Sequence, residues 1–260
     1  MKKAVAFWSG GKDSGMALDR LRRGGEYEIA ALITTVNAAF GRVSMHGVRE
    51  ELIDLQADAI GIPVHKMYVA GRGCNDDYVP ALRTTLEIFK RREITRVMFG
   101  DIFLEDLRQW REDLLSSLGM TGIFPLWKED TGALAQEFIE RGFKAVVCCT
   151  NDAQLTKGDV GRALDASFFR DLPASVDPCG ENGEYHTFVY DGPIFRRPVI
   201  FEVGETVYRP LLTAAPAGGA SPSPAVAASS IPVPAASGAT ATKGFWFVDL
   251  VAKRPDLNDT

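Results

Sequence analysis

Short apolar runs alternate with helical patterns through the first part of the chain. The first run covers residues 4–8 and ends at a pair of glycines, which is typical of a strand buried on both faces of a parallel sheet. Similar runs occur at residues 29–35, 64–69 and 96–100. Helical patterns occupy residues 14–23, 48–60 and 104–118. This alternation predicts βαβ units, and therefore an α/β fold with a doubly wound parallel sheet.

Two of the expected helices carry further signals. The helix at residues 48–60 is amphipathic, and its apolar side chains are expected to share one buried face. That face contains Val48, Leu52, Leu55 and Ala59. Another helix is expected to begin at a cap formed by Asp76 or Asp77 and to run to about residue 92.

The pattern loosens after residue 119. Expected helices cover about 130–142 and 160–171, and expected strands cover 143–149, 184–189, 198–203 and 206–209. These elements predict a smaller α+β domain at residues 120–212, which follows an N-terminal domain at residues 1–119.

The composition changes sharply at residues 213–243. All but four of these residues are Ala, Pro, Gly, Ser or Thr, and such a segment cannot bury enough apolar surface to offset its ordering entropy. A disordered linker is therefore predicted. The terminal segment 244–260 opens with an apolar run at residues 245–250, which we expect to return as an edge strand or to dock on the main body.

Charge and cysteine usage argue against several classes of protein. The formal net charge of -5 argues against a large nucleic-acid surface, which needs clustered Lys and Arg. None of the four cysteines has C-x-x-C spacing, so a zinc or iron–sulfur site is not expected. The first apolar run is too short for a signal peptide or a membrane span, which predicts a cytoplasmic protein without membrane contact.

The segment between the first strand and the first helix has the chemistry of a phosphate-binding loop. It consists of Ser9, Gly10, Gly11, Lys12, Asp13 and Ser14. Glycines allow close backbone approach, and the N–H groups at a helix start attract anions. Lys12 can neutralise phosphate charge, and Asp13 can hold Mg²⁺ beside it. The alternative is an ordinary helix start that Asp13 and Ser14 merely cap.

A second polar cluster lies in residues 177–189. Its candidate ligand-binding side chains are Glu181, Asn182, Glu184, His186 and Thr187. Alternation along a strand would place Glu184 and His186 on one face, where they could converge on a ligand. A polar turn that enters a hairpin, with His186 in a structural role, is the alternative.

The phosphate loop resembles the S-G-G-x-D-S signature of the N-type ATP pyrophosphatases, the PP-loop enzymes. Together with other segments, it makes the chain resemble the diphthine–ammonia ligase family, the ATP-binding domain-4 group of PP-loop proteins. The matching segments are residues 9–14, 42–47, 61–63, 99–102, 125–127, 161–165 and 180–184. They occur in the expected order across residues 3–205, about four-fifths of the chain.

This resemblance implies an adenine nucleotide alpha hydrolase-like (HUP-type) sheet that binds ATP with Mg²⁺. It implies an amide ligase that adenylates a carboxylate, releases pyrophosphate, and lets ammonia displace AMP. The acceptor would belong to a protein such as elongation factor 2 or to a small molecule. A homodimer is compatible with the sequence.

Further residues are expected to serve this chemistry. The backbone near Thr34 and Thr35 is expected to meet adenine, and Asp101 to face the ATP crevice unless it only caps the next helix. His186 could act as a general base near neutral pH or only bind the substrate. Substrate contacts are also expected from His46, Arg49 and Arg108, although the two arginines could equally be ordinary surface charges.

The second cluster departs from the family pattern. It has G-E-N-G-E-Y-H-T where the name-giving members have roughly G-E-G-G-E-Y-E-T, so Asn182 and His186 are the differences, and the chain matches a bacterial-type branch better. Two other hypotheses therefore stay open. One is a PP-loop enzyme with another acceptor, such as a tRNA, and the other is a nucleotide-binding sensor without turnover.

Overall fold

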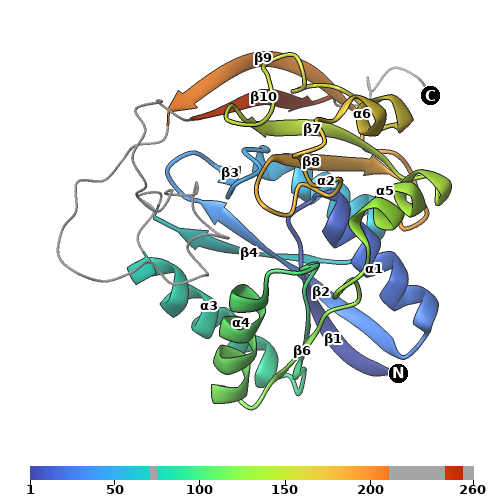
Figure 1. Ribbon diagram of the computed structural model, residues 1–260. Helices are drawn as coiled ribbons and strands as arrows, with labels where there is room; N and C mark the ends of the chain where they lie inside the picture. The colour runs from blue at the N-terminus through green and yellow to red at the C-terminus, as the bar shows by residue number, and fades with distance from the viewer. Residues whose placement is uncertain (71–74, 211–243, 254–260) are drawn as a thin grey trace, which may run out of the picture.

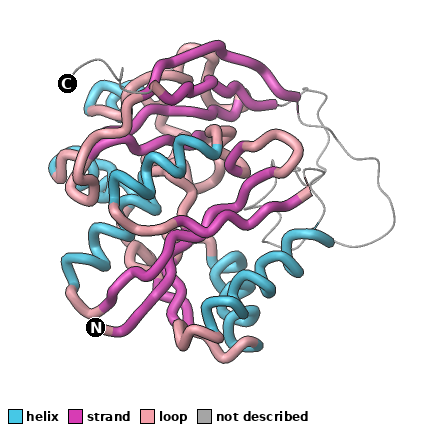
Figure 2. Tube along the Cα trace, turned by 180° about the vertical axis from the view of Figure 1, so that it is seen from behind, coloured by secondary structure: helices cyan, strands magenta, loops and turns pink. Residues whose placement is uncertain are grey.

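The computed structural model describes residues 1–70, 75–210 and 244–253. It contains two sheets with helices between them and beneath the first (Figure 1). From one side to the other, the layers are α3 with α4, the first sheet, α1 with α2, and the second sheet. The view from behind shows helices enclosed between the two sets of strands (Figure 2). The site must therefore be sought where the two sheets approach each other.

The first sheet has a parallel core in the order β4–β2–β1–β5–β6. Its strands are β1 (Lys2–Phe7), β2 (Tyr27–Asn37), β4 (Val64–Val69), β5 (Arg96–Met98) and β6 (Thr121–Ile123). The short β3 (Arg42–Val43) pairs antiparallel with the end of β2. The predicted parallel α/β sheet is confirmed, with β1 at its centre because this strand is apolar on both faces.

Two pairs of helices cover the two faces of this sheet. They are α1 (Lys12–Gly24) with α2 (Glu50–Ile60), and α3 (Asn75–Lys90) with α4 (Glu105–Ser117). The face under α3 and α4 has its own apolar core, which includes Val5, Leu86 and Val97. The core on the opposite face continues through α1 and α2 into the second sheet, so the two sheets share one hydrophobic interior.

The second sheet is antiparallel in the order β8–β7–β10–β9. Its strands are β7 (Lys144–Asn151), β8 (Tyr185–Asp191), β9 (Phe201–Pro210) and β10 (Gly244–Ala252). Two helices accompany it, α5 (Thr131–Glu140) and α6 (Ala166–Asp171). Asp130 caps α5, with its carboxylate accepting from Ala133 N at 2.8 Å. The smaller α+β unit expected after the first sheet is thus present.

The structure corrects several local predictions. The segment that contains β10 is an internal strand between β7 and β9 and not an edge strand. Leu55 is 37% exposed, so it lies off the buried face of α2. A single strand, β9, replaces the two strands expected at 198–203 and 206–209, and α6 covers only the end of the helix expected at 160–171. The α3 helix begins at Asn75, before the expected caps at Asp76 and Asp77.

Two further points bear on the domain predictions. Strand β6 was not predicted, and it belongs to the first sheet although it lies beyond residue 119. The predicted linker at residues 213–243 falls outside the described residues. Within the described part of the chain, no helix has the length and apolar character that a membrane span requires. A cytoplasmic location stays a prediction.

Candidate functional site

The predicted phosphate loop lies at the carboxyl end of β1, the central strand of the parallel sheet. Gly10 adopts a left-handed conformation with φ of +80°, and Gly11 forms the N-cap of α1. The Ser9 hydroxyl accepts from Gly11 N at 3.2 Å, and the Ser14 hydroxyl donates to Gly11 O at 2.9 Å. The loop therefore presents backbone N–H groups at a helix start, where anions are stabilised.

Strand β8 of the second sheet covers this loop directly. Lys12 N donates to Thr187 Oγ1 at 3.0 Å, and Val189 N donates to Gly10 O at 2.8 Å. The approach is so close that a Cβ added to Gly11 would lie 3.1 Å from Thr187 O. The structure thus brings the two polar clusters of the sequence together at one interface.

Lys12 is a buried cation in the middle of this interface. Its side chain is only 4% exposed, and Nζ lies 2.8 Å from Asp13 Oδ1 and also donates to Cys179 O. Burial by itself lowers the pKa of Lys12, but the charge of Asp13 and other neighbours outweigh it, so the net shift is upward. Lys12 therefore keeps its positive charge at neutral pH.

Carboxyl groups surround Lys12. Glu181 accepts from Ile102 N at 2.7 Å, at the carboxyl end of β5. Burial, followed by the charge of Asp13, raises the pKa of Glu181 to about 8. Burial also raises the pKa of Asp13, against the opposing effect of Lys12. The site thus contains acids that hold protons more tightly than usual, which is a common property of functional sites.

Asp101 follows β5 and pairs with an arginine that the sequence analysis did not single out. Its carboxylate lies 2.8 Å from Arg111 Nε, and both side chains are largely buried. The N-cap of α4 is Leu104, so the alternative role of Asp101 as the cap of that helix is wrong. The carboxylate nevertheless lies near enough to Glu181 to raise its pKa.

Two histidine rings pack against each other beside the loop, tilted by 39°. The rings of His46 and His186 lie 4.7 Å apart, and His46 Nδ1 lies 3.0 Å from Thr187 O. Burial lowers the pKa of His46 to about 4, and burial followed by the nearby His46 lowers that of His186 well below its ordinary value. The expected titration of His186 near neutral pH is therefore wrong. Within the described residues, its buried Nε2 has no hydrogen-bond partner.

Glu184 and His186 do not converge on one ligand. Glu184 lies in the turn before β8 and is 1% exposed. Its carboxylate accepts from Asp177 N at 3.1 Å, and from Asn182 N at 2.9 Å and Nδ2 at 3.1 Å. Glu184 and Asn182 thus hold the turn in shape, whereas Thr187 contacts the loop and Glu181 contacts the backbone that follows β5. Because β8 begins at Tyr185, the alternation expected from Glu184 onward does not include Glu184.

The remaining predicted residues lie around the same edge of the sheet. Thr34 is fully buried and its hydroxyl donates to Trp8 O at 2.7 Å, while the neighbouring Thr35 is partly exposed. Arg49 forms two hydrogen bonds with Asp249 of β10, at 2.7 and 3.0 Å. The guanidinium of Arg108 packs over aromatic rings at the end of β6 and bonds Glu112 at 2.8 Å. Both arginines therefore have protein partners.

Gln56 is a site residue that the sequence analysis missed. It is fully buried on the apolar face of α2 and donates to Gly10 O at 3.0 Å. The available signal was a glutamine between buried apolar positions of an amphipathic helix. Its contacts with the loop depend on the tertiary fold and have no mark in the local sequence.

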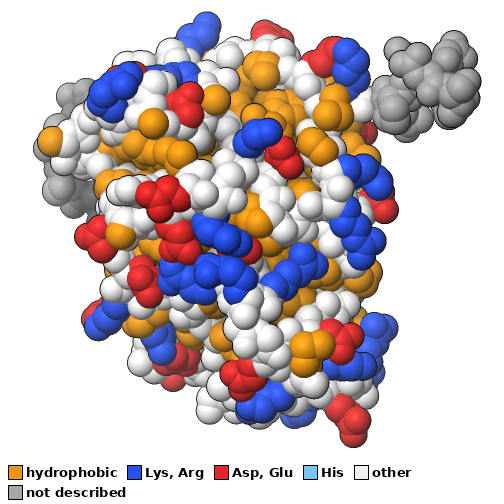
Figure 3. Space-filling model, turned by 90° about the vertical axis from the view of Figure 1, so that its right-hand side faces the viewer, with side chains coloured by type: hydrophobic (Ala, Val, Ile, Leu, Met, Phe, Trp, Pro, Cys, Tyr) orange, Lys and Arg blue, Asp and Glu red, His pale blue; other side chains and the backbone are white. Residues whose placement is uncertain are grey.

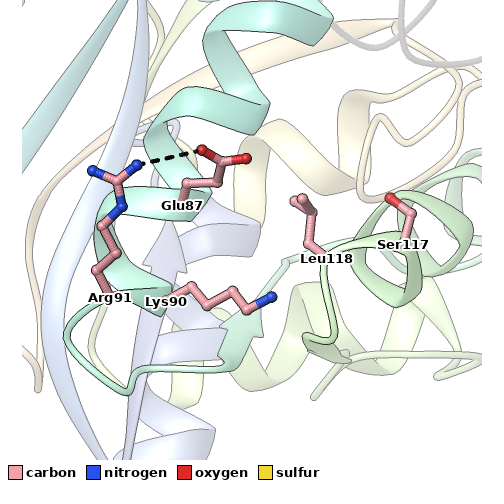
Figure 4. A pocket seen from close by; sticks show the side chains of 5 residues that line it. All are labelled: Glu87, Lys90, Arg91, Ser117 and Leu118. Carbon is pink, nitrogen blue, oxygen red and sulfur yellow. Dashed lines mark ion pairs between the residues drawn. The ribbon is translucent and has the colours of Figure 1, made fainter.

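Other surface features lie away from this interface. A hollow between the ends of α3 and α4 is lined by Glu87, Lys90, Arg91, Ser117 and Leu118 (Figure 4). These helix ends lead into the amino ends of β5 and β6, so the hollow lies at the edge of the sheet opposite the loop.

The side of the molecule next to α1 and α5 shows basic groups across its middle (Figure 3). Acids of the same elements pair with them. Arg20 and Arg23 pair with Glu137, and Arg23 and Arg141 pair with Asp19. This arrangement is an ion network, in which the basic groups are already partly neutralised.

The fold and the loop together define a class of two-domain α/β proteins, in which a glycine-containing strand–loop–helix lies under a second, antiparallel sheet. The family model described as the diphthamide synthase N-terminal domain matches residues 1–122, and the one described as the diphthamide synthase C-terminal domain matches residues 130–209. The chain therefore belongs to the diphthamide synthase family. The family expected from the sequence motifs is confirmed.

Curated relatives carry the name diphthine–ammonia ligase. Those from Bos taurus and Homo sapiens are each 26% identical over 228 residues, which is 79% of this chain and 85% of each relative. The relative from Schizosaccharomyces pombe is 26% identical over 225 residues, and the chain spans only 37% of its length. The family is thus one of enzymes, namely ligases.

A solved structure gives a weaker match. It is the crystal structure of a predicted subunit of tRNA methyltransferase from Methanocaldococcus jannaschii, at 17% identity with a TM-score of 0.39. The match covers 74% of this chain and 98% of that one. A similarity this low carries no argument about function.

Proposed function

We propose that the chain is an ATP-dependent amide ligase, which activates a carboxylate with ATP and transfers the acyl group to ammonia. The observation that carries the proposal is the buried Lys12 in a glycine loop at the carboxyl edge of the parallel sheet, directly under β8. The chain belongs to a family whose curated relatives are named diphthine–ammonia ligase, and this membership supports the same reaction.

The loop would hold the terminal phosphates of ATP. Gly11 at the start of α1 and the ammonium group of Lys12 supply donors and positive charge there. Adenine would lie near Thr34 and Thr35, at the end of the neighbouring strand. Because Thr187 and Cys179 O occupy donors of Lys12 in this structure, ATP would replace part of these contacts.

Asp13 is the proposed Mg²⁺ ligand. Among the described residues, no group of three or more His, Cys, Asp or Glu side chains is arranged to hold a metal. This fits Mg²⁺, which commonly uses one or two carboxylates together with substrate phosphates. Asp13 supplies one such carboxylate, now paired with Lys12, and bound Mg²⁺ would help to neutralise phosphate charge.

The proposed reaction has two steps. A carboxylate oxygen of the acceptor attacks the α-phosphorus, the bond to the bridging oxygen breaks, and pyrophosphate leaves with its charge stabilised by Lys12. Ammonia then attacks the acyl carbon, and the bond between that carbon and the AMP oxygen breaks. The proton that the nitrogen loses would pass to the carboxylate of Asp101 or to solvent, because the lowered pKa makes His186 a weak base and the raised pKa leaves Glu181 already protonated at neutral pH.

The acceptor is proposed as a carboxylate on a protein or a small molecule, and diphthine is the one that the names of the relatives indicate. His186, where the name-giving members have an acid, lies next to the loop and could therefore alter which acceptor fits. His46 lies beside it and would contact the same acceptor. A role of Arg49 or Arg108 in binding the acceptor would require release from its present partner.

The decisive experiment separates the products of ATP. The full chain is incubated with Mg-ATP and ammonium, with and without candidate acceptors that include diphthine-bearing elongation factor 2, and AMP, ADP, pyrophosphate and phosphate are quantified. AMP and pyrophosphate that depend on an acceptor and disappear in Asp13→Asn would support the proposal. Formation of ADP and phosphate would refute cleavage between the α- and β-phosphates, and ATP binding without products would favour a sensor.

A further inference from the structure

Gln56 is a fully buried amide on an otherwise apolar helix face. Its side chain is 0% exposed in α2, where Leu52, Ile53 and Ile60 are buried around it. Burial of a primary amide is unfavourable unless its polar atoms find partners. The reason for a glutamine at this position must therefore lie in the groups that its amide contacts.

Three hydrogen bonds fix this amide in one orientation. The indole Nε1 of Trp8 donates to Oε1 at 2.8 Å, and Nε2 donates to Gly10 O at 3.0 Å and to Val189 O. An indole nitrogen can only donate and a carbonyl oxygen can only accept, so a flipped amide would break all three bonds. One side chain thus joins the end of β1, the phosphate loop and β8.

The contact with Gly10 controls the direction of the loop backbone. A Cβ added to Gly10 would lie 2.8 Å from Gln56 Oε1, so the loop packs directly against this amide. In a trans peptide, the carbonyl and the next N–H point in opposite directions. With Gly10 O held towards α2, the Gly11 N–H is directed to the other side of the loop, where it donates to the Ser9 hydroxyl.

We infer that Gln56 is a positioning residue, which together with Val189 of β8 aims the Gly10–Gly11 peptide at an anionic polyphosphate ligand. The inference rests on the proposed function, because it presumes that the loop binds phosphate groups. It adds that the loop is fully shaped only while the second sheet is docked, since Gln56 bonds Gly10 and Val189 at the same time.

The first test replaces Gln56 by Met, which keeps the length of the side chain and removes its hydrogen bonds. Binding of inorganic pyrophosphate and of Mg-ATP is measured calorimetrically on the full chain. We expect about tenfold weaker binding, because one oriented bond to a charged ligand is lost. Leu86→Ala is the control for lost stability, and it should bind within about twofold of wild type because it lies on the opposite face of the sheet.

The second test, Gln56→Glu, has a readout that a merely structural role would not move. A neutral Glu can accept from Trp8 and donate one O–H to a carbonyl, whereas a carboxylate cannot donate at all. Burial favours the neutral form of the introduced carboxyl group. At each pH, the affinity of Gln56→Glu is divided by the affinity of wild type. This ratio should rise as the pH is lowered from about 8.5 to about 6. The same ratio for Gln56→Met should stay flat.

The outcomes separate this inference from the proposed function. If wild type binds neither pyrophosphate nor Mg-ATP, the proposed function fails and the inference fails with it. If wild type binds and a folded Gln56→Met binds equally well, the inference alone is wrong. Should Gln56→Met not fold, Trp8→Phe decides, because it removes the donor that orients the amide and leaves the amide itself in place. A smaller loss in the same direction is expected from it, and unchanged affinity would overturn the inference.

Discussion

Lys12 keeps its charge although protein surrounds it. Removing an ammonium group from water is unfavourable by several kcal/mol unless other groups compensate. Asp13 and Cys179 O supply that compensation in this structure. The cation is therefore held in place before any ligand arrives, which is the arrangement that electrostatic catalysis requires.

Replacing Lys12 by Met should remove this charge and keep most of the side-chain volume. We expect turnover to fall by about 100-fold or more, because a positioned cation that faces the leaving pyrophosphate is lost. A steady-state assay of AMP formation measures it. Lys144→Met, which removes an exposed lysine paired with Asp191, should keep wild-type turnover. Equal turnover in both variants would exclude Lys12 from catalysis.

Glu181 gives the fold a pH dependence of known sign. The pKa of its carboxyl is raised from 4.5 to about 8 by burial and by Asp13. Between these values the folded protein retains a proton that the unfolded chain has lost, so the free energy of unfolding falls as the pH rises.

Urea unfolding of wild type and Glu181→Gln at about pH 5, 6.5 and 8 would reveal this effect. The stability of wild type relative to the variant should decline by at most about 1.4 kcal/mol per pH unit across this window. Screening and the coupling to Asp13 will reduce the slope. A stability difference that does not change with pH would show that Glu181 titrates normally.

At the scale of elements, strands with a strong apolar signal were predictable. The run at residues 64–69 coincides with β4, and β1 and β2 differ from their predicted bounds by a few residues. Strand β6 has only three residues and no periodic pattern, so its place is fixed by pairing with β5. The exposure of Leu55 likewise depends on which face of α2 meets the second sheet.

The two site segments, residues 9–14 and 177–189, were also predictable, because each consists of consecutive residues with recognisable chemistry. How the two segments are arranged relative to each other was not predictable. Glu184 supports a turn, and Arg49 bonds Asp249, which lies 200 residues further along the chain. Such pairings follow from how the two sheets dock, and no local pattern encodes them. Gln56 was not predicted as a site residue for the same reason.

The contact between the start of α1 and β8 can be tested with matched glycine substitutions. A Cβ at Gly11 would lie 3.1 Å from Thr187 O of β8 and 2.7 Å from His46 Cε1, whereas a Cβ at Gly24 meets nothing within 4 Å. We expect Gly11→Ala to lower the free energy of unfolding by about 1–3 kcal/mol through overpacking. Gly24→Ala should have little effect. Thermal unfolding distinguishes the two, and equal stabilities would mean that β8 does not press on the loop.

On the scale of the whole molecule, ion pairs help to hold the second sheet on the first domain. Asp249 of β10 accepts from Arg49 of the α2 N-cap at 2.7 Å and from Arg42 of β3 at 2.9 Å. Hydrogen bonding to Arg49 lowers the pKa of Asp249. The group is partly exposed, so its contribution is modest and sensitive to salt.

Asp249→Asn should therefore weaken the docking of the two sheets. We expect a loss of about 0.5–2 kcal/mol at neutral pH and low salt, because three hydrogen bonds to a charged group are weakened. The loss should shrink in high salt, and also as the pH falls through the lowered pKa of Asp249, where the wild-type carboxylate takes up a proton. Chemical unfolding in both salts measures it. The control is Asp191→Asn, which affects an exposed ion pair with Lys144. An equal loss of stability in this variant would show that Asp249 contributes no more than an ordinary exposed ion pair.

The internal place of β10 sets an order of events during synthesis. This strand comes from residues 244–252 but lies between β7 and β9, which the ribosome has made long before. Until β10 emerges, the facing edges of those two strands lack their partner, and unpaired edges invite association with other chains. The parallel sheet can form early, whereas the cover over its loop is complete only after residue 252 has left the exit tunnel. A nascent chain halted before that point would carry the loop without its finished cover.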